Sequence, residues 1–466
     1  MASIVFENFS GGLDLRRSQS MSAVNVLFKC NNAYVTTGRA VRKRPCATRF
    51  AVLGPGTVGL EAGQGKLNTF SGVAVTHTNP LLANHVILHP VSGASPSIIH
   101  YSTVFNTQLY VVAGYPDGTS RHFYNDVAVA DTSCPHTRVV EKIGQKIYAA
   151  SAGPGGAGTH PPGSNVDYCK TSDPTNWSAP NDAGFLPSGI EAVGSDTVTA
   201  LGNFRGDLSV FFSDSSQLWG VDPDPAQTAL IQNNANVGTI HAHSPRDFAN
   251  DLTFLAKMGF RSMSLATITL SLTENDIGSP IDKLRPDIGD NDNLRSLFYP
   301  TLGQLWEIDG ATAYVLSYSK SNKVTAWSLY TYPFTIDAAC VLNNELYARS
   351  GDIVYRMDAT AYADDGVVPL CEVDMFYQDN KRPGILKQFW GYDAVVEGTP
   401  QVAFGFDPRK PALQTDWVDV TGDTRPDALA PMELACTSLA PRFRHQRNEA
   451  FQLDMFQPYY EELGAV

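Results

Sequence analysis

The 466-residue sequence predicts an all-β fold: a β-propeller of about six or seven blades with an additional C-terminal antiparallel β-domain. Charged residues make up only 17% of the chain, below the roughly 25% of an average domain, and turn formers are abundant. Helical periodicity is scarce, whereas short alternating runs rich in β-branched and aromatic residues are frequent. These runs recur in similar pairs about every 40–55 residues, a repeat typical of a propeller. Unrelated hairpins in one large sandwich are the alternative.

Residues 1–63 are expected to form an N-terminal docking segment and the first strands. The stretch FENFSGGLDLRRSQSMSAVNVLFKCNNAYVTTGRAVRKRP begins at Phe6 and ends in a basic cluster, Arg42-Lys43-Arg44, followed by Pro45. It lacks a basic region followed by an apolar run, so we expect no secretory signal. No stretch of 18 apolar residues occurs, so we expect no membrane span.

Residues 64–360 are predicted to form the propeller, with blades between about Lys66 and Thr360. Each repeating unit has a turn, a strand, a second turn and another strand. The first strands of these units are expected at Gln108–Gly114, Gln145–Ser151, Asp207–Asp214, Asp251–Lys257, Thr312–Tyr318 and Glu345–Gly351. The second strands are SRHFYND, NVDYCKT, SQLWGVD, RSMSLAT, KVTAWSL and DIVYRMD.

Two loops interrupt the repeats. Ser151–Asn165 is rich in Gly and Pro, but it lacks the GK[ST] ending and the strand–loop–helix context of a phosphate-binding loop. Thr273–Ser296 reads as a polar insertion with a short helix around Ile281–Leu284, either a contact surface or an ordinary loop. Beyond it, residues 361–466 show longer alternating strands and are predicted to be the separate antiparallel β-domain.

The formal net charge of −13 disfavours sequence-specific binding of DNA, although it suits a surface that DNA must pass without adhering, or simply a soluble assembly subunit. The cysteine count is seven, an odd number, and no pair has CxxC spacing. Neither a zinc site nor a disulfide framework is indicated, and we expect free buried thiols.

Motifs that could carry chemistry are weak. TSDPTNWS, at Thr171–Ser178, resembles the Asp-box turn of sialidase-type propellers, in which the Asp caps a hairpin and the Trp packs between blades, so Asp173 is expected to be structural. His241 and His243 alternate and are expected on one face of a strand, where a metal or hydrogen bonds could hold them. Two oxygen-rich stretches, Asp287–Asn293 and Asp419–Asp427, fit calcium loops or ordinary Asx turns. We therefore expect no enzymatic activity, no cofactor and no metal.

Basic residues gather at Arg16-Arg17, at Arg42-Lys43-Arg44 and at Arg442–Arg447. In an acidic protein such clusters bind an acidic neighbour more often than nucleic acid, although a solvated edge is the plainer interpretation. We predict an assembly interface at the following residues: Gly11, Gly12, Arg16, Arg17, Asn31, Asn32, Gly38, Arg42, Lys43, Arg44 and Pro45.

The pattern of a Gly pair, a polar or basic run, further Asn residues and a Lys-Arg-Pro ending resembles the N-terminal signature of tail nozzle proteins of short-tailed phages. These proteins are also called tail tubular protein B, and the tail-hub or packaged-DNA-stabilisation proteins look similar. The matching residues are Gly11, Gly12, Arg16, Asn31, Asn32, Gly38, Lys43, Arg44 and Pro45. Cys46 departs from the small or apolar residue usual after the Pro, and the chain is shorter than the longer nozzles.

The resemblance implies a structural virion protein, made in the host bacterial cytoplasm. It would form a homo-oligomeric, often sixfold, ring below the portal and the head-to-tail adaptor, hold fibres or spikes, and surround the channel through which double-stranded DNA passes without sequence-specific binding. A glycan-binding or glycoside-processing β-propeller, motivated by TSDPTNW, is the alternative and would need a pocket on the propeller axis with clustered acids and aromatics. A bacterial surface scaffold is a third option, which the expected lack of a secretory signal disfavours.

Overall fold

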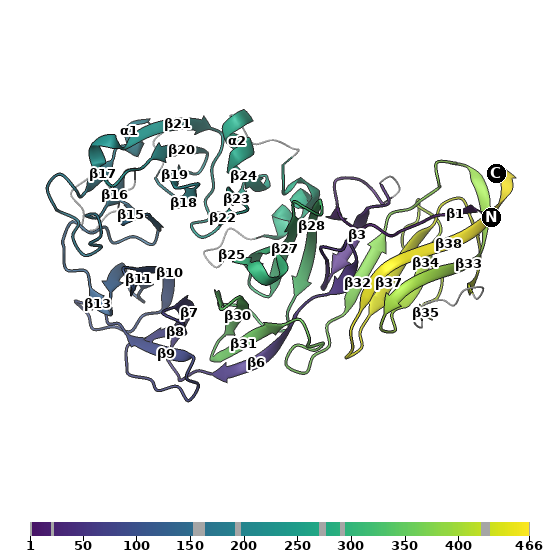
Figure 1. The fold of residues 1–466 in the computed structure, drawn as a ribbon, viewed down its shortest axis with the longest axis horizontal. Helices are drawn as coiled ribbons and strands as arrows, with labels where there is room; N and C mark the ends of the chain where they lie inside the picture. The colour runs from purple at the N-terminus through teal and green to yellow at the C-terminus, as the bar shows by residue number, and fades with distance from the viewer. Residues whose placement is uncertain are drawn as a thin grey trace.

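The computed structural model describes residues 2–19, 23–151, 164–191, 197–269, 276–288, 294–420 and 429–465. It has two β-bodies: a ring of blades, and a β-sandwich that carries both chain ends at its far tip (Figure 1). The fold class predicted from the sequence is therefore confirmed, and the ring has seven blades within the described residues.

Each blade is a small sheet whose first strand lies nearest the axis. Strands of the first four blades are β7 (Val58–Gly63), β8 (Lys66–Ser71) and β9 (Leu82–Val86); β10 (Ile98–Phe105), β11 (Gln108–Gly114), β12 (Ser120–Tyr124) and β13 (Val127–Ala128); β14 (Val140–Ile143), β15 (Lys146–Ala150), β16 (Val166–Tyr168) and β17 (Gly184–Leu186); β18 (Ala200–Phe204), β19 (Asp207–Phe211), β20 (Ser215–Gly220) and β21 (Ala229–Ala235). The last three have β22 (Arg246–Phe248), β23 (Asp251–Ala256) and β24 (Gly259–Ser262); β25 (Arg295–Tyr299), β26 (Gln304–Asp309), β27 (Thr312–Ser319) and β28 (Val324–Thr331); β29 (Ala338–Leu342), β30 (Glu345–Ser350), β31 (Ile353–Asp358) and β6 (Cys46–Val52).

Apart from RSMSLAT, the predicted strands are where the repeats place them, because the connecting turns have the required chemistry. The turns between the first and second strands at Asn106-Thr107, Ala249-Asn250 and Asn343-Asn344 each hold two successive residues at positive φ. Such turns match the right-handed twist of antiparallel strands, and Asn tolerates this backbone better than most residues. Five of the six predicted Leu/Ile-Tyr/Ser/Thr runs are second strands of blades, and Thr312–Tyr318 lies in β27, the third strand of the sixth blade.

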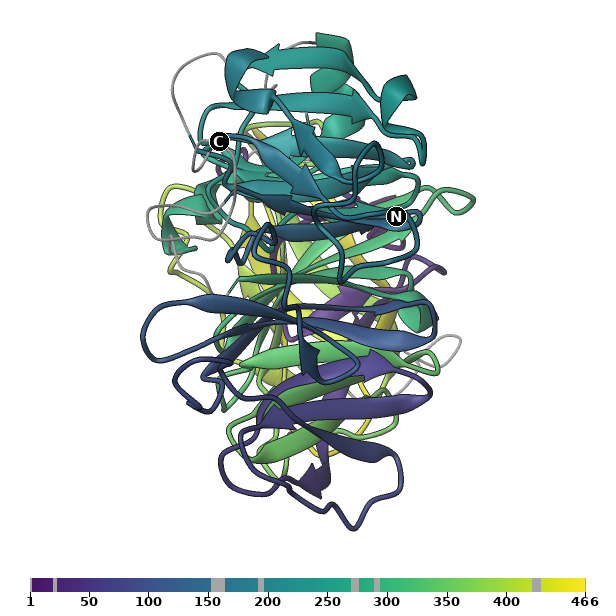
Figure 2. The ribbon, with the colours of Figure 1, turned by 90° about the vertical axis from the view of Figure 1, so that its left-hand side faces the viewer.

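Apolar clusters fill the gaps between neighbouring blades. Phe105, Tyr110 and Ile147 pack between the second and third blades, and Trp306 packs with Tyr330 between the sixth and seventh. Figure 2, seen from the propeller side, shows these sheets one above another, from the teal strands β18–β21 at the top to the purple strands β6–β9 at the bottom. The core of the ring therefore consists of layers between blades.

Ring closure depends on a strand from before the propeller repeats. β6 pairs antiparallel with β31 over the register Cys46↔Asp358 to Val52↔Ile353, and so supplies the outer strand of the blade made by β29–β31. The blade that follows in the ring begins directly afterwards, with β7. One stretch of chain thus joins the last blade to the first.

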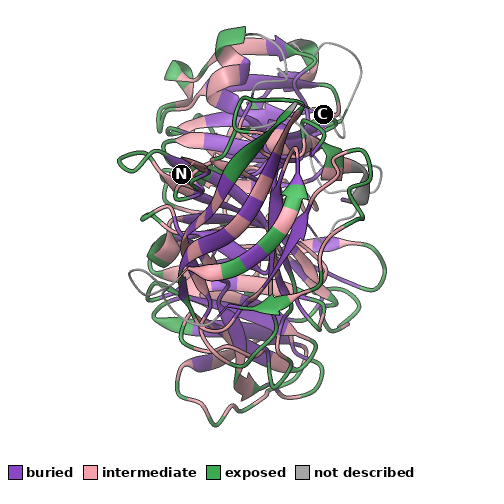
Figure 3. Ribbon diagram, turned by 90° about the vertical axis from the view of Figure 1, so that its right-hand side faces the viewer, coloured by how far each residue is buried: buried purple, intermediate pink, exposed green. Residues whose placement is uncertain are grey.

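The sandwich is built from both ends of the chain. Its strands are β1 (Ala2–Ser3), β2 (Gly12–Leu13), β3 (Val26–Asn31), β4 (Ala33–Val35), β5 (Val41–Lys43), β32 (Cys371–Met375), β33 (Ile385–Glu397), β34 (Gln401–Gly405), β35 (Val418–Asp419), β36 (Ala430–Cys436), β37 (Ala440–His445) and β38 (Gln452–Ala465). One sheet has the order β36-β33-β38-β5-β4, with β1 paired to β38. Figure 3 shows buried and more exposed residues alternating along its long strands, as expected of a sheet with one face on a core.

The second sheet of the sandwich is continuous with a propeller blade. Within the described residues it runs β25-β26-β27-β28-β2-β3-β32-β37-β34-β35, so the sixth blade passes into the sandwich without a linker. The pairings of β2 with β28 and with β3 are parallel, through Gly12↔Trp327 and Gly12↔Val26. The two bodies are therefore fixed to each other by a shared sheet.

This arrangement revises the predicted boundaries. Residues 1–63 were expected to be one segment and 361–466 a separate domain, but β1–β5 complete the sandwich and β6 and β7 belong to the propeller. The propeller thus spans β6 to β31, and the sandwich needs both chain ends. The sequence could not show this, because strand periodicity identifies strands without naming their partners.

The helices are short. They are α1 (Ser188–Glu191), α2 (Met263–Thr269), η1 (Pro225–Gln227), η2 (Ser279–Asp287) and η3 (Pro300–Leu302). RSMSLAT was predicted to be a strand, but the strand ends at Ser262 and α2 begins at Met263. The short helix expected around Ile281–Leu284 lies within η2. Most of the loop Ser151–Asn165 lies outside the described residues, and so does part of each oxygen-rich stretch.

Candidate functional site

A cavity of about 450 Å³ lies on the propeller axis. Residues on or next to the first strands of all seven blades line it, from β7, β10, β14, β18, β22, β25 and β29. Its volume falls within the range of sites that bind small molecules. The inner strands of adjacent blades pack against one another around this axis, so each presents a few side chains to the same space.

Four charged side chains line the cavity, each from a different blade. Glu61 comes from β7, Glu141 from β14, Arg246 from β22 and Arg295 from β25. Aromatic rings contribute as well, from Tyr101, Phe298, His100 and His243. The cavity is therefore rich in charged and hydrogen-bonding groups held on rigid strands.

The carboxyl groups have raised pKa values. Burial raises the pKa of Glu61 to about 7, although the Ser102 hydroxyl, Arg295 and Arg246 pull it down. Burial also raises the pKa of Glu141 to about 7, with Arg246 as the main opposing influence. Both groups therefore titrate near neutral pH, which is the range useful for proton transfer and a common mark of functional sites.

A third carboxyl lies directly behind the cavity wall. Glu307 on β26 is fully buried, and its Oε2 accepts a hydrogen bond from the hydroxyl of Ser296, which lines the cavity. Burial raises the pKa of Glu307 to about 8 against the Ser296 hydrogen bond and the charge of Arg246. At neutral pH this side chain is therefore largely protonated.

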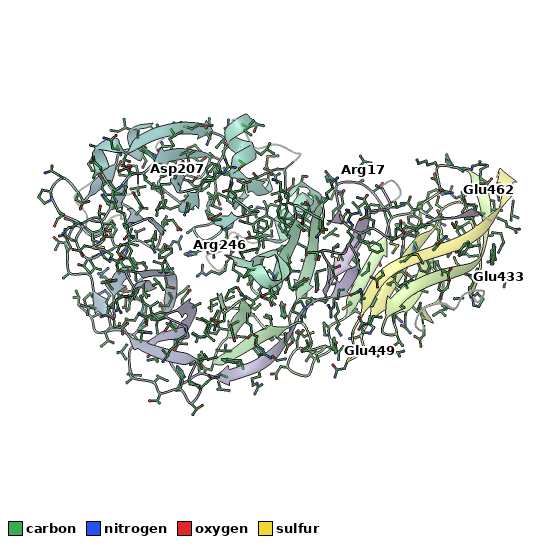
Figure 4. The ribbon with its side chains drawn as sticks, in the orientation of Figure 1. Arg17, Asp207, Arg246, Glu433, Glu449 and Glu462 are labelled. Atoms are coloured by element: carbon green, nitrogen blue, oxygen red, sulfur yellow. The ribbon has the colours of Figure 1, made fainter. Side chains whose placement is uncertain are left out.

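Arg246 reaches into the opening of the ring. Figure 4 shows the labelled side chain extending from its strand toward the axis. Within the described part of the chain, no hydrogen bond or ion pair holds its guanidinium, although its charge acts on Glu61, Glu141 and Glu307. The group is therefore able to pair with a molecule in the cavity.

The two histidines predicted to share a strand face do not. His241 and His243 lie in the turn before β22, outside any strand. Nε2 of His241 lies 3.4 Å from Nη2 of Arg285, whereas His243 lines the cavity and stacks on His100 with ring centroids 6.2 Å apart. Burial, aided by Arg295, holds the pKa of His243 well below its ordinary value, so this ring is neutral at physiological pH.

The predicted assembly residues divide into two groups. The first group is buried inside the chain and comprises Gly12, Asn32, Lys43, Arg44 and Pro45. The expectation that Lys43 and Arg44 present docking charges to a neighbour is therefore corrected: Nζ of Lys43 donates to the Arg447 carbonyl at 2.9 Å, and Arg44 is 1% exposed.

Arg44 lies at the centre of the joint between propeller and sandwich. Its guanidinium donates to both Asp364 oxygens at 2.9 and 2.5 Å, to Oδ1 of Asn32 at 2.9 Å and to the Thr331 carbonyl at 2.7 Å. It also stacks over the Tyr332 ring, 4.0 Å from the centroid. One side chain thus ties together the N-terminal segment, the end of the sixth blade and the chain that follows the seventh.

The second group stays at least partly exposed and comprises Gly11, Arg16, Arg17, Asn31, Gly38 and Arg42. Arg16 pairs with Asp14 at 2.7 Å while half of its side chain remains accessible. Figure 4 places Arg17 at the edge of the joint. The role of these six residues in assembly stays a prediction.

The Asp-box interpretation of TSDPTNWS is confirmed in its structural part. Oδ1 of Asp173 accepts hydrogen bonds from the backbone nitrogen and the hydroxyl of Thr175, at 3.2 and 2.7 Å. Trp177 is buried in the apolar cluster between the second and third blades and donates from Nε1 to the Pro174 carbonyl. The motif closes a turn and fills a gap between blades.

All seven cysteines are free and buried, as expected from their spacing. Among the residues that the structure describes, no three His, Cys, Asp or Glu side chains come close enough together to hold a metal ion. Nor, in the same part of the chain, does any helix have the length and apolar character needed to span a bilayer.

Sequence reasoning missed the cavity residues. Glu61, Glu141, Arg246 and Arg295 lie in short inner strands, ahead of the runs by which the blades were recognised, and no run was recognised in the blade of Glu61. A search for charged residues at that position in successive repeats could have found them. Their convergence on one space depends on ring closure, which periodicity does not reveal.

No protein-family model and no curated protein matches the chain. Solved structures with similar folds include BamB from Moraxella catarrhalis, 10% identical over 76% of this chain and 95% of that one, with a TM-score of 0.36. The WD40 β-propeller domain of Doa1 is also 10% identical, over 76% and 96%, with a TM-score of 0.33. The Neurospora crassa Pan2 WD40 domain is 8% identical over 71% and 88%, also at 0.33. At these scores the likeness carries no argument about function.

Proposed function

We propose that this chain is a structural, non-enzymatic subunit of a bacteriophage tail. It forms a ring, as nozzle or hub, below the portal and the adaptor, surrounds the DNA exit channel, retains packaged DNA and supports fibres and genome ejection. The observation that carries the proposal is the position of the signature residues. Gly12, Asn32 and Arg44, which carry the resemblance to tail nozzle proteins, lie buried at the joint between the two β-bodies.

The joint supports the proposal because a closed ring needs subunits of fixed shape. Copies of one chain close a ring only when each repeats the same rotation, and a hinged subunit would vary it. Here a continuous sheet and the buried Arg44–Asp364 ion pair join the bodies. The buried residues among those that carry the resemblance thus lie where the subunit's geometry is set.

The size of the axial cavity also bears on where DNA would pass. A cavity of about 450 Å³ is far too small for duplex DNA, a rod about 20 Å across. The channel would therefore lie between copies of the chain, and the propeller axis would be left for another use. The net charge of −13 suits a channel wall to which DNA does not adhere.

Electron microscopy and light scattering of the purified chain test the proposal. We expect a ring, sixfold by the resemblance, with a central hole of about 20–40 Å. Replacing Arg16 and Arg17 by Glu should abolish the ring, or its docking to the adaptor, while the chain still melts cooperatively. The melting temperature itself should fall, because the buried Asp14 loses its partner Arg16. A monomer that neither closes a ring nor joins a tail would contradict the proposal.

The matched control is the pair Arg409-Lys410 on the sandwich. Arg409 pairs with Asp407 as Arg16 pairs with Asp14, two residues along the chain, and it is also exposed. Replacing Arg409 and Lys410 by Glu changes the charge equally at a site outside the predicted interface. Loss of the ring in both variants would point to net charge and not to docking at Arg16 and Arg17.

A second candidate, a glycan-binding or glycoside-processing propeller, is favoured by the cavity itself. Such a function needs a pocket on the propeller axis with acids and aromatics, and Glu61, Glu141 and Tyr101 are placed in that way. A glycan array probed with the full chain tests it. Binding that Glu61→Ala and Glu141→Ala leave unchanged would argue against a site in the cavity.

A further inference from the structure

The axial cavity combines fixed positive charge with carboxyl groups that titrate. Arg246 and Arg295 line it, and Arg138 and Lys142 lie close enough to influence its titratable groups. Facing them are Glu61 and Glu141, with Glu307 behind Ser296 and Asp247 beside Glu141. His100 and His243 complete the polar wall.

The charge of this space depends on pH in one direction. The guanidinium groups stay positive throughout, and His243 stays neutral because its pKa is lowered. Glu61 and Glu141 lose their negative charge as the pH falls through about 7, and Glu307 does so at about 8. The cavity is therefore net positive in mild acid and becomes more nearly balanced above neutral pH.

Polar atoms in and behind the wall can still accept or donate hydrogen bonds. Nε2 of His243 is buried and bonds no other group in the described residues. Oε1 of Glu307 is also buried and has no hydrogen-bond partner among the described residues. Arg246 is exposed, and its guanidinium forms no hydrogen bond or ion pair within the same residues. A guest with both an anionic group and hydroxyl groups would satisfy such a wall, since buried polar groups are normally hydrogen-bonded.

We propose that the axial cavity binds a monosaccharide-sized sugar acid, whose carboxylate pairs with Arg246 while its hydroxyl groups bond Glu61 and Glu141. The inference rests on the second candidate function and does not depend on ring assembly. A guanidinium recognises a carboxylate by paired, charge-assisted hydrogen bonds. Carboxyl side chains are suited to hydroxyl groups, which both donate and accept.

The two simpler guests fit the charges less well. A neutral sugar satisfies the carboxyl groups but leaves Arg246, an exposed guanidinium, without the charge-assisted hydrogen bonds that a carboxylate offers. A bare inorganic anion satisfies Arg246 but lies beside Glu61 and Glu141, which repel it once they ionise. Only a guest with both kinds of group uses the whole wall.

Titration calorimetry of the full chain tests the proposal with three probes: D-glucuronate, D-glucose and inorganic phosphate. At pH 6 we expect glucuronate to bind at least tenfold more tightly than glucose or phosphate. Between pH 6 and pH 8 the affinity for glucuronate should fall severalfold, because the ionised carboxyl groups of the cavity repel the carboxylate of the ligand. Arg246→Gln should weaken binding at least tenfold, whereas Arg409→Gln, on the exposed surface of the sandwich, should not.

Glu61→Gln tests the pH dependence of binding, which would not change if Glu61 had only a structural role. The amide still bonds a hydroxyl group but cannot ionise, so this variant should bind glucuronate with a flatter pH dependence. Melting curves establish that each variant is folded, which Arg246→Gln should be because the side chain is exposed.

The three probes separate the possible failures. Equal binding of glucose and glucuronate would overturn the sugar-acid proposal and leave the glycan function standing. Equal binding of phosphate would overturn it in favour of a plain anion site. Binding of no probe would overturn it, and silence on the glycan array as well would remove the second candidate function.

Discussion

At the scale of single residues, the buried charge of Arg44 stabilises the fold through its ion pair with Asp364. Its guanidinium and the Asp364 carboxylate are 0% and 1% exposed and neutralise each other. Arg44→Met leaves the Asp364 charge buried without a partner, a change that typically costs about 3–5 kcal/mol. We expect this loss in the free energy of unfolding, measured by denaturant titration.

The neighbouring ion pair provides the control. Arg49 and Asp365 lie 2.6 Å apart but are 51% and 33% exposed. Arg49→Met should leave the free energy of unfolding nearly unchanged, because solvent screens an exposed pair. Similar losses in the two variants would show that burial of Arg44 is not what makes it important.

Glu307 should give the protein a pH-dependent stability. The folded chain keeps the proton of this buried side chain up to a pKa of about 8, whereas the unfolded chain loses it near the ordinary value of 4.5. Between these values the folded state binds more protons, so raising the pH lowers the free energy of unfolding.

Glu307→Gln cannot ionise and should remove this fall, raising the free energy of unfolding at pH 8 by about 2–4 kcal/mol. The exposed Glu433→Gln, with no such burial, should leave the pH profile unchanged. Denaturant titrations at pH 5, 6.5 and 8 measure the effect. A Glu307→Gln profile as steep as that of the native chain would contradict the assignment.

Residue roles were predictable from the sequence where they depend on local chemistry. The hairpin cap at Asp173 and the packing of Trp177 follow from a turn motif, and both are as predicted. The prediction for Arg44 was wrong because its role depends on a distant partner. Asp364 is 320 residues away, and a basic cluster before a Pro is typical of an exposed surface. The four charged cavity residues were missed for the same reason, because they come together only when the ring closes.

At the scale of elements, the shared sheet depends on Gly12. Its φ of +57° is a conformation that favours glycine, and an added Cβ would lie 2.7 Å from Cα of Ala326 and 2.8 Å from the nitrogen of Trp327. Gly12→Ala must therefore push β2 away from β28. We expect a loss of about 2–4 kcal/mol in the free energy of unfolding, from backbone strain and overpacking together.

Gly38→Ala is the matched control within the same segment. There an added Cβ meets nothing closer than Oγ1 of Thr36, at 3.6 Å, so the change should stay within about 0.5 kcal/mol. Limited proteolysis adds a structural readout, because a loosened joint should expose the chain around β2 and β3. If Gly12→Ala were as stable and as resistant as Gly38→Ala, the close pairing of β2 with β28 would be wrong.

Strands with local hairpin partners were the elements that the sequence predicted best. The six runs with Asn- or Gly-containing turns are strands at their expected positions. The strands of the first blade were harder to recognise, because β8 and β9 pair in parallel and lack a tight turn between them. The strand predicted through RSMSLAT was wrong from Met263 onward, where α2 begins. Ser264 of α2 donates hydrogen bonds to Asp251 from both its backbone nitrogen and its hydroxyl.

At the scale of the whole molecule, the chain is one rigid unit made of two bodies that interleave in sequence. Both termini lie at the tip of the sandwich, while the propeller is formed by the chain between them (Figure 1). The propeller class was predictable because it follows from repeats. The shared sheet was not, because it joins strands separated by about three hundred residues and gives no periodic signal.

The closure of the ring by β6 makes a prediction about which part of the chain can fold as a propeller. A fragment of residues 46–360 keeps β6 and β7, whereas 64–360, the range expected from the repeats alone, loses both. Without β6, β31 has an open edge, and without β7 the first blade lacks its inner strand. The apolar cluster between the seventh and first blades also loses Leu53 and Leu60, which are both buried.

We expect fragment 46–360 to be soluble and to melt cooperatively. Its melting temperature should be lower than that of the full chain, because its β28 edge is uncovered. Fragment 64–360 should aggregate or bind a hydrophobic dye without a cooperative transition. Circular dichroism melts and size-exclusion chromatography compare the two. Equal stability would mean that the ring closes without β6, and that the N-terminal segment serves only the sandwich.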